Sequence, residues 1–128
     1  MNSEKPTDAP SNPRLLNSIR ELNDSSVEDM ERCLRVALNS LLESELVVGE
    51  EDGEPSTFET DDEELMLALF TDLIELHMFA PGSPWKAMEA GDALRQIKEG
   101  EYDGLVINPS GVSLALSRDD VLEFFEID

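Results

Sequence analysis

The sequence has few of the residues on which catalysis and metal binding commonly depend. Its 128 residues include one cysteine, Cys33, and one histidine, His77. A single cysteine excludes an intrachain disulfide and a cysteine-based zinc site, and a lone histidine cannot form an HExxH-type pair. Neither a Gly-rich phosphate loop nor a GxSxG nucleophile elbow occurs. We therefore expect no enzymatic activity, no metal site and no cofactor.

Basic residues are scarce, and the acids that outnumber them are unevenly distributed. Nine Lys and Arg face thirty Asp and Glu, which gives a formal net charge of −21. Fifteen acids and two bases fall within residues 24–64, whereas residues 1–23 are balanced. Nucleic-acid backbones and anionic membranes attract clustered Lys and Arg, so we expect neither as a direct partner. The excess acid either keeps a small protein soluble or steers it to a basic protein surface.

Long apolar runs and a signal pattern are also missing. The apolar runs are much shorter than the roughly 20 residues of a membrane helix. The N-terminal sequence MNSEKPTDAP has no basic segment followed by an apolar one. These features predict a cytoplasmic protein, and 40% hydrophobic residues are enough for a packed core.

Aromatic residues make up only 5% of the chain, which disfavours the carbohydrate cleft that paired-carboxylate glycosidases use. Two acidic runs, at 50–54 and 61–64, invite a calcium interpretation. Neither has the alternating ligands, the Gly and the distal Glu of an EF-hand loop. We interpret both runs as solvated turns.

Helix signals occur at both ends of the chain. Residues 1–11 are rich in Pro and polar residues and predict a disordered tail, which leaves 12–128 as a single domain. Asn12-Pro13 predicts the start of a first helix, and Ser25 with Glu28 predicts a capping box for a second. This second helix is expected to carry an apolar stripe that extends from Val27 to Leu41. Further helices are predicted at 72–78, at 90–98 and after a capping box formed by Ser117 and Asp120.

Short strands are predicted at 46–48, 57–60, 65–70, 85–88, 104–107 and 112–116. The first three suggest an antiparallel meander, although residues 65–69 alone fit a helix equally well. The last two suggest a hairpin around the turn 108–111. The predicted class is α+β: N-terminal helices followed by a mixed, mainly antiparallel sheet of about five to six short strands, with helices on one side and a C-terminal helix.

Several residues are candidate contacts with a partner. Tryptophan beside a turn commonly anchors its own loop, but it is also enriched at interfaces, and this chain has one. The predicted turns contribute an asparagine and an acidic run. The candidate partner contacts are Trp85, Asn108, Asp61, Asp62, Glu63 and Glu64.

The order of several motifs resembles the N-terminal domain of the bacterial enhanced serine sensitivity (SseB) family. The stretches that carry the resemblance are 12–16 (NPRLL), 37–48 (ALNSLLESELVV), 68–72 (ALFTD) and 104–111 (GLVINPSG), followed by Leu116-Ser117-Arg118. The resemblance implies a mixed α/β domain of the bacterial cytoplasm without an established activity or cofactor. Many family members carry a further C-terminal domain, which is not part of the sequence given.

Three hypotheses on function follow. The first is a non-enzymatic protein-interaction or regulatory module, which fits the missing catalytic residues and the resemblance. The second is an acidic immunity or antitoxin-like protein that masks a basic surface of its partner, with residues 24–64 as the contact face. The third is an enzyme, which would have to work with carboxylates alone. A homodimer is compatible with all three.

Overall fold

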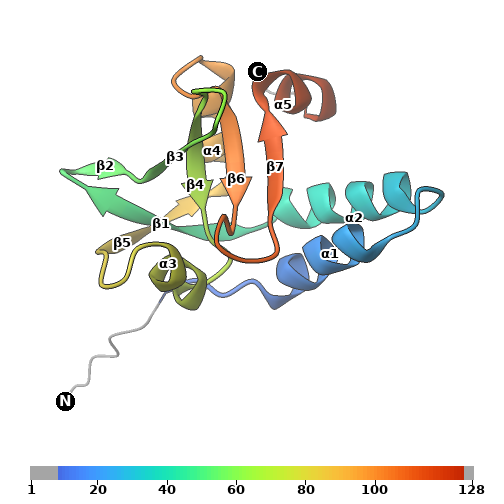
Figure 1. The fold of residues 1–128 in the computed structure, drawn as a ribbon, viewed down its shortest axis with the longest axis horizontal. Coiled ribbons are helices and arrows are strands. Elements are labelled where there is room, and N and C mark those ends of the chain that lie inside the picture. Colours follow the sequence, from blue (N-terminus) through green and yellow to red (C-terminus); the bar gives the residue numbers. More distant parts are fainter. Residues whose placement is uncertain (1–8, 126–128) are drawn as a thin grey trace.

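The computed structural model describes residues 9–125, which form five helices and seven strands (Figure 1). The helices are α1 (Pro13–Asp24), α2 (Met30–Leu42), α3 (Leu73–Phe79), α4 (Ala90–Lys98) and α5 (Arg118–Phe124). The strands are β1 (Glu45–Glu51), β2 (Glu54–Pro55), β3 (Thr57–Glu59), β4 (Leu65–Leu69), β5 (Trp85–Glu89), β6 (Gly104–Ile107) and β7 (Leu114–Ser117). No helix within residues 9–125 combines the length and the apolar character of a membrane span. The α+β class is confirmed.

The strands form two sheets that meet along one seam. One sheet has the order β2-β1-β5 and the other the order β3-β4-β6-β7. At the seam, the amides of Val47 and Phe70 each donate to the carbonyl of the other residue at 2.9 Å. Ser56, between β2 and β3, donates to the Gly49 carbonyl and accepts from the Ala68 amide. The strands therefore number seven in two joined sheets, rather than five to six in one.

The expected meander is correct only in part. β3 and β4 pair antiparallel, as predicted, but β1 pairs with β2 and with β5. β4 and β6 are parallel, and β6 and β7 form the predicted hairpin. β5, one of the two partners of β1, comes from a segment much later in the chain, and local sequence signals do not encode such a pairing.

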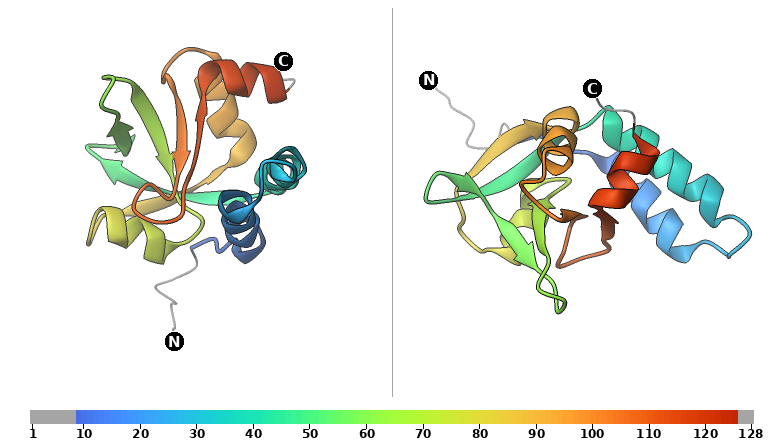
Figure 2. Two further views of the ribbon diagram at one scale, coloured as in Figure 1. Left: turned by 45° about the vertical axis from the view of Figure 1, so that its right-hand side comes forward. Right: turned by 90° about the horizontal axis from the view of Figure 1, so that it is seen from above.

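Alternation along the strands divides the core into two parts, because successive side chains point to opposite faces. In β4, Leu67 and Leu69 join the larger cluster, whereas Met66 and Ala68 join the smaller one. The larger cluster includes side chains of α1, α2, α4 and α5. The smaller one includes Leu76 of α3. Helices therefore cover both faces of the sheets, and α3 corrects the expectation of helices on one side (Figures 1 and 2).

The predicted helix starts are mostly confirmed. α1 begins at Pro13, and Ser117 and Asp120 form the predicted capping box of α5. The box expected between Ser25 and Glu28 is wrong. Ser25 instead ends α1, donating its hydroxyl and its amide to the Leu22 carbonyl. α2 consequently begins only at Met30.

Part of the predicted tail lies on the folded domain. Ala9 packs against the smaller core cluster. The Asn12 amide donates to the Thr71 carbonyl at 3.0 Å, which holds the chain against the end of β4. The rest of the predicted tail, residues 1–8, lies outside the described residues.

Candidate protein-contact surfaces

Trp85 lies at the start of β5, opposite Gly49 of β1. Its side chain is half-buried and packs against the smaller core cluster. The ring therefore anchors an edge strand and leaves part of its surface exposed. The pairing of β5 with β1 fixes the position of the Trp85 backbone.

Asn108 is fully buried, at the end of β6. Its Oδ1 accepts from the Thr71 amide at 3.0 Å, and its Nδ2 donates to the Thr71 hydroxyl at 3.1 Å. Its backbone has a φ of 57°, in the left-handed region that Asn tolerates better than most residues. We predicted a partner contact for this side chain, but the structure directs it inward, where it fastens the end of β6 to the residue after Phe70.

The turn that contains Asp61, Asp62, Glu63 and Glu64 is exposed. The Thr60 hydroxyl accepts from the amides of Asp62 and Glu64 at 3.2 and 3.1 Å. The backbone is therefore shaped by Thr60, and all four carboxylates point from a defined turn into solvent.

The candidate residues do not form one site. β4 and β6 are parallel, and Met66 to Leu69 face Gly104 to Ile107. The acidic turn 61–64 precedes β4, whereas Asn108 follows β6, so the two lie at opposite ends of these strands. Four residues of strand separate them, which is about 13 Å. Trp85 belongs to the other sheet.

The first acidic run borders a hollow, and the strand that follows the second run forms another part of its lining. A hollow of about 480 Å³ is lined by Glu51, Asp52, Glu54, Pro55, Thr57, Leu65, Glu101 and Tyr102. Leu65, on its edge, directly follows the turn 61–64. Burial, and then the carboxylates of Glu101 and Glu54, raises the pKa of the Tyr102 phenol above its ordinary value. We call this surface, with the turn 61–64, the acidic hollow. Both runs were visible in the sequence, but the hollow that the first run lines together with Tyr102 was not.

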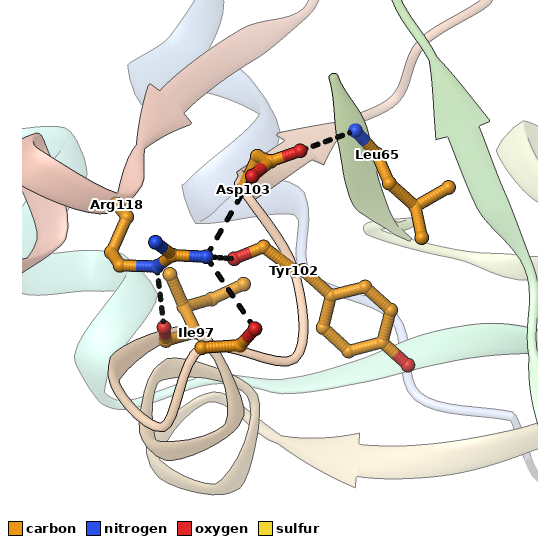
Figure 3. Close-up of polar contacts among 6 residues, drawn as sticks. Leu65, Ile97, Tyr102, Asp103 and Arg118 are labelled. Atoms are coloured by element: carbon orange, nitrogen blue, oxygen red, sulfur yellow. Dashed lines mark hydrogen bonds and ion pairs between the residues drawn. The ribbon is translucent and has the colours of Figure 1, made fainter. Parts of the chain in front are cut away.

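Arg118 holds one side of the acidic hollow in place (Figure 3). Its Nε donates to the Ile97 carbonyl at 3.2 Å, and an Nη donates to the Tyr102 carbonyl at 2.7 Å. The Asp103 carboxylate lies 3.7 Å from the guanidinium and accepts from the Leu65 amide at 2.8 Å. Arg118 therefore links the end of α4, the loop 99–103 and the start of β4. The sequence signalled only a helix start here.

Arg118→Ala is expected to lower the free energy of unfolding by about 1.5–3 kcal/mol, because charged hydrogen bonds to several carbonyls are lost together. Arg118→Lys should recover only part of that loss, since one ammonium cannot reproduce the guanidinium fork. Urea denaturation of the two variants measures both effects. Equal stability of Arg118→Lys and the parent chain would contradict the role assigned to the fork.

Glu75, in the first turn of α3, carries a buried oxygen that no described residue hydrogen-bonds. Its carboxylate lies against Gly111, where an added Cβ would come within 2.7 Å of Oε1. Burial, and then the Asp72 carboxylate, raises the pKa of Glu75 above its ordinary value, while Arg20 opposes the shift. Compared with the unfolded chain, folding therefore strengthens proton binding by this carboxyl.

A raised folded-state pKa means that ionised Glu75 destabilises the fold, increasingly as pH rises above the unfolded value near 4.5. Glu75→Gln should therefore gain about 0.5–1 kcal/mol of stability relative to the parent chain at neutral pH. That gain should shrink toward pH 4.5. Asp119→Asn, an exposed first-turn acid of α5, controls for the general relief of negative charge. A gain that is independent of pH, or matched by Asp119→Asn, would contradict the assignment.

An apolar groove of about 310 Å³ lies between α2 and α5. Its apolar walls are Leu34, Leu38, Leu42, Phe124 and Phe125, with Glu31, Arg35 and Asn39 beside them. Leu42 and Phe124 are 49% and 40% exposed. We call this surface the α2–α5 groove, and Figure 2 shows α1, α2 and α5 at the same end of the molecule.

The apolar stripe predicted for the second helix is only partly buried. We expected this stripe to be buried from Val27 to Leu41. It is buried at Ala37, Leu38 and Leu41, whereas Val27 is 86% exposed. The helical spacing is correct within α2, but Val27 precedes this helix; Leu34 and Leu38 of the stripe line the groove.

Cys33 and His77, the residues considered for catalysis or metal binding, do not belong to an organised site among the described residues. Cys33 is half-buried on α2, and His77 is exposed on α3. Within residues 9–125, no group of three or more His, Cys, Asp or Glu side chains is arranged to hold a metal ion. Among its surface features, the described structure thus presents the acidic hollow and the apolar α2–α5 groove on an α+β domain. Comparison of the chain with protein-family models, with curated proteins and with solved structures finds no match.

Proposed function

We propose that the chain is a non-enzymatic protein-interaction module of the SseB N-terminal type, working in the bacterial cytoplasm. The observation that carries this proposal is the solvent exposure of the α2–α5 groove. Among residues 9–125, most of the exposed large apolar side chains belong to residues 27–42 or to α5, and two of them, Leu42 and Phe124, line the groove. A gathered apolar surface with a polar rim is typical of a protein-binding site.

The proposal is tested by affinity capture from a bacterial lysate, with the bound proteins identified by mass. We expect one protein to be enriched in both low and high salt, because apolar contacts resist screening. The proteins captured by the parent chain are compared with those captured by the double variant Leu42→Gln, Phe124→Gln. An empty capture at low salt would contradict the proposal.

A second candidate function has its own support. The acidic hollow fits an immunity or antitoxin-like protein that masks a basic, nucleic-acid-binding surface of its partner. Opposite charge at such a surface accelerates association and fixes the partner's orientation. In this function, capture should be lost at high salt.

Charge reversal in the acidic turn tests this second function. Replacing Asp61, Asp62, Glu63 and Glu64 by Lys should slow association with a basic partner by about tenfold or more at low salt, because steering depends on the local field. Stopped-flow or surface-plasmon kinetics measure the rate. Replacing exposed acids of α5, such as Asp119 and Glu123, provides the matched control. An unchanged association rate in the turn variant would exclude this function.

A further inference from the structure

The dimensions of the α2–α5 groove indicate what kind of ligand it accepts. Leu34, Leu38 and Leu42 recur every four residues and form one wall along α2. They span eight residues of helix, which is about 12 Å or two turns. Phe124 and Phe125 form the other wall. A row of leucines along one helix, beside two aromatic side chains, fits the helix-in-groove mode, in which a partner helix inserts anchors spaced three or four residues apart.

The charges around the groove select the partner further. Glu28, Asp29 and Glu31 precede or begin α2, and Asp119, Asp120 and Glu123 lie on or beside α5. The two arginines of this part of α2 are paired with acids: Arg32 with Asp29 at 3.3 Å and Arg35 with Glu31 at 3.5 Å. Glu31 and Arg35 are the charged residues that line the groove itself, whereas the other charged residues of 28–42 and of α5 are mostly acidic, which favours Lys and Arg on the ligand.

The same charges disfavour a second copy of this chain. Each copy has a formal net charge of −21, and a symmetric contact would place two identical, mainly acidic pairs of helices opposite each other. Like charges across an interface lower affinity. The favoured occupant is thus a segment of a different, basic protein.

We infer that the α2–α5 groove binds a short amphipathic helix of a partner protein, with apolar anchors on one face and Lys or Arg on its flanks. This inference rests on the proposed function and names the ligand class of that interaction. Leu42 and Phe124 contact the anchors, and Glu31 and Glu123 face the basic flanks.

The inference is tested with the full chain and a synthetic amphipathic peptide that has Leu on one helical face and Lys on the other. Fluorescence anisotropy should show saturable binding. The double variant Leu42→Gln, Phe124→Gln should bind at least about tenfold more weakly, since buried anchors dominate such interfaces. Ile74→Gln on α3 removes an equally apolar side chain, 73% exposed, and should leave binding unchanged. A peptide with Glu in place of Lys should bind at least about tenfold more weakly.

Several results would overturn the inference. They are the absence of binding, equal binding by the double variant, and equal binding of the Glu peptide. Sedimentation of the chain as a dimer that the double variant dissociates would assign the groove to a second copy. If a protein captured from lysate binds the double variant as well as the parent chain, the groove inference fails while the interaction function stands. An empty capture would count against the function itself.

Discussion

Phe70→Ala is expected to lower the free energy of unfolding by about 3–5 kcal/mol, the largest effect of any substitution we consider. Phe70 is fully buried at the seam between the two sheets, and its ring lies 5.6 Å from that of Phe79. Alanine would leave a cavity at the point where the sheets are joined. The same seam carries the paired hydrogen bonds to Val47, so the loss should affect both sheets.

Urea denaturation followed by the fluorescence of Trp85 measures this loss, because Trp85 packs against the same core cluster. Phe124→Ala is the matched control, since this ring is 40% exposed and its removal should cost about 1 kcal/mol or less. If Phe70→Ala does not fold, Phe70→Leu should still show a loss of about 1–2 kcal/mol. Equal effects at positions 70 and 124 would contradict the assigned seam.

Asn108→Ala is expected to destabilise the protein by about 2–4 kcal/mol, for two reasons that can be separated. The buried Thr71 amide loses its acceptor, which costs about 1–3 kcal/mol. Alanine is also strained at the φ of 57° that Asn108 adopts, which adds about 1 kcal/mol.

Asn108→Gly separates the two contributions, because glycine adopts positive φ without strain but cannot accept the hydrogen bond. It should be about 1 kcal/mol more stable than Asn108→Ala and still weaker than the parent chain. Amide hydrogen exchange at Thr71 should accelerate in both variants. Protection of Thr71 at the parent level in Asn108→Gly would show that the side chain is not its essential partner.

Asn108 and three predicted helix starts illustrate what the sequence predicted and what it could not. The box of Ser117 with Asp120 predicted a helix start because it acts between neighbouring residues. Pro13 also opens α1 as predicted, but the Asn12 side chain makes no cap bond and donates to the distant carbonyls of Glu45 and Thr71. Ser25 failed because its polar groups complete the preceding helix, which competes with starting the next. For Asn108 the sequence predicted a turn, but its bond to Thr71 spans 37 residues. Only the parallel pairing of β4 and β6 creates that contact.

The same distinction applies to the contact surfaces. The acidic runs and the apolar stripe could be read from residue types and spacing, because both are local patterns. The sequence did not show which segments come together to form the two surfaces. The acidic hollow requires the β1–β2 hairpin beside the loop with Tyr102. The groove requires Phe124 and Leu42 to line the same surface. Arg118, which holds the Tyr102 side of the hollow, carries no local signal of its carbonyl partners.

The rate constants for binding of a captured partner test the central claim most directly, namely that this chain binds a protein through its α2–α5 groove. We predict that the double variant Leu42→Gln, Phe124→Gln releases the partner at least about tenfold faster, with little change in association rate, because loss of apolar anchors acts mainly on dissociation. Lysine substitution of the turn 61–64 should leave dissociation unchanged. A groove variant with unaltered rate constants, together with slowed association of the turn variant, would contradict the claim and assign binding to the acidic hollow.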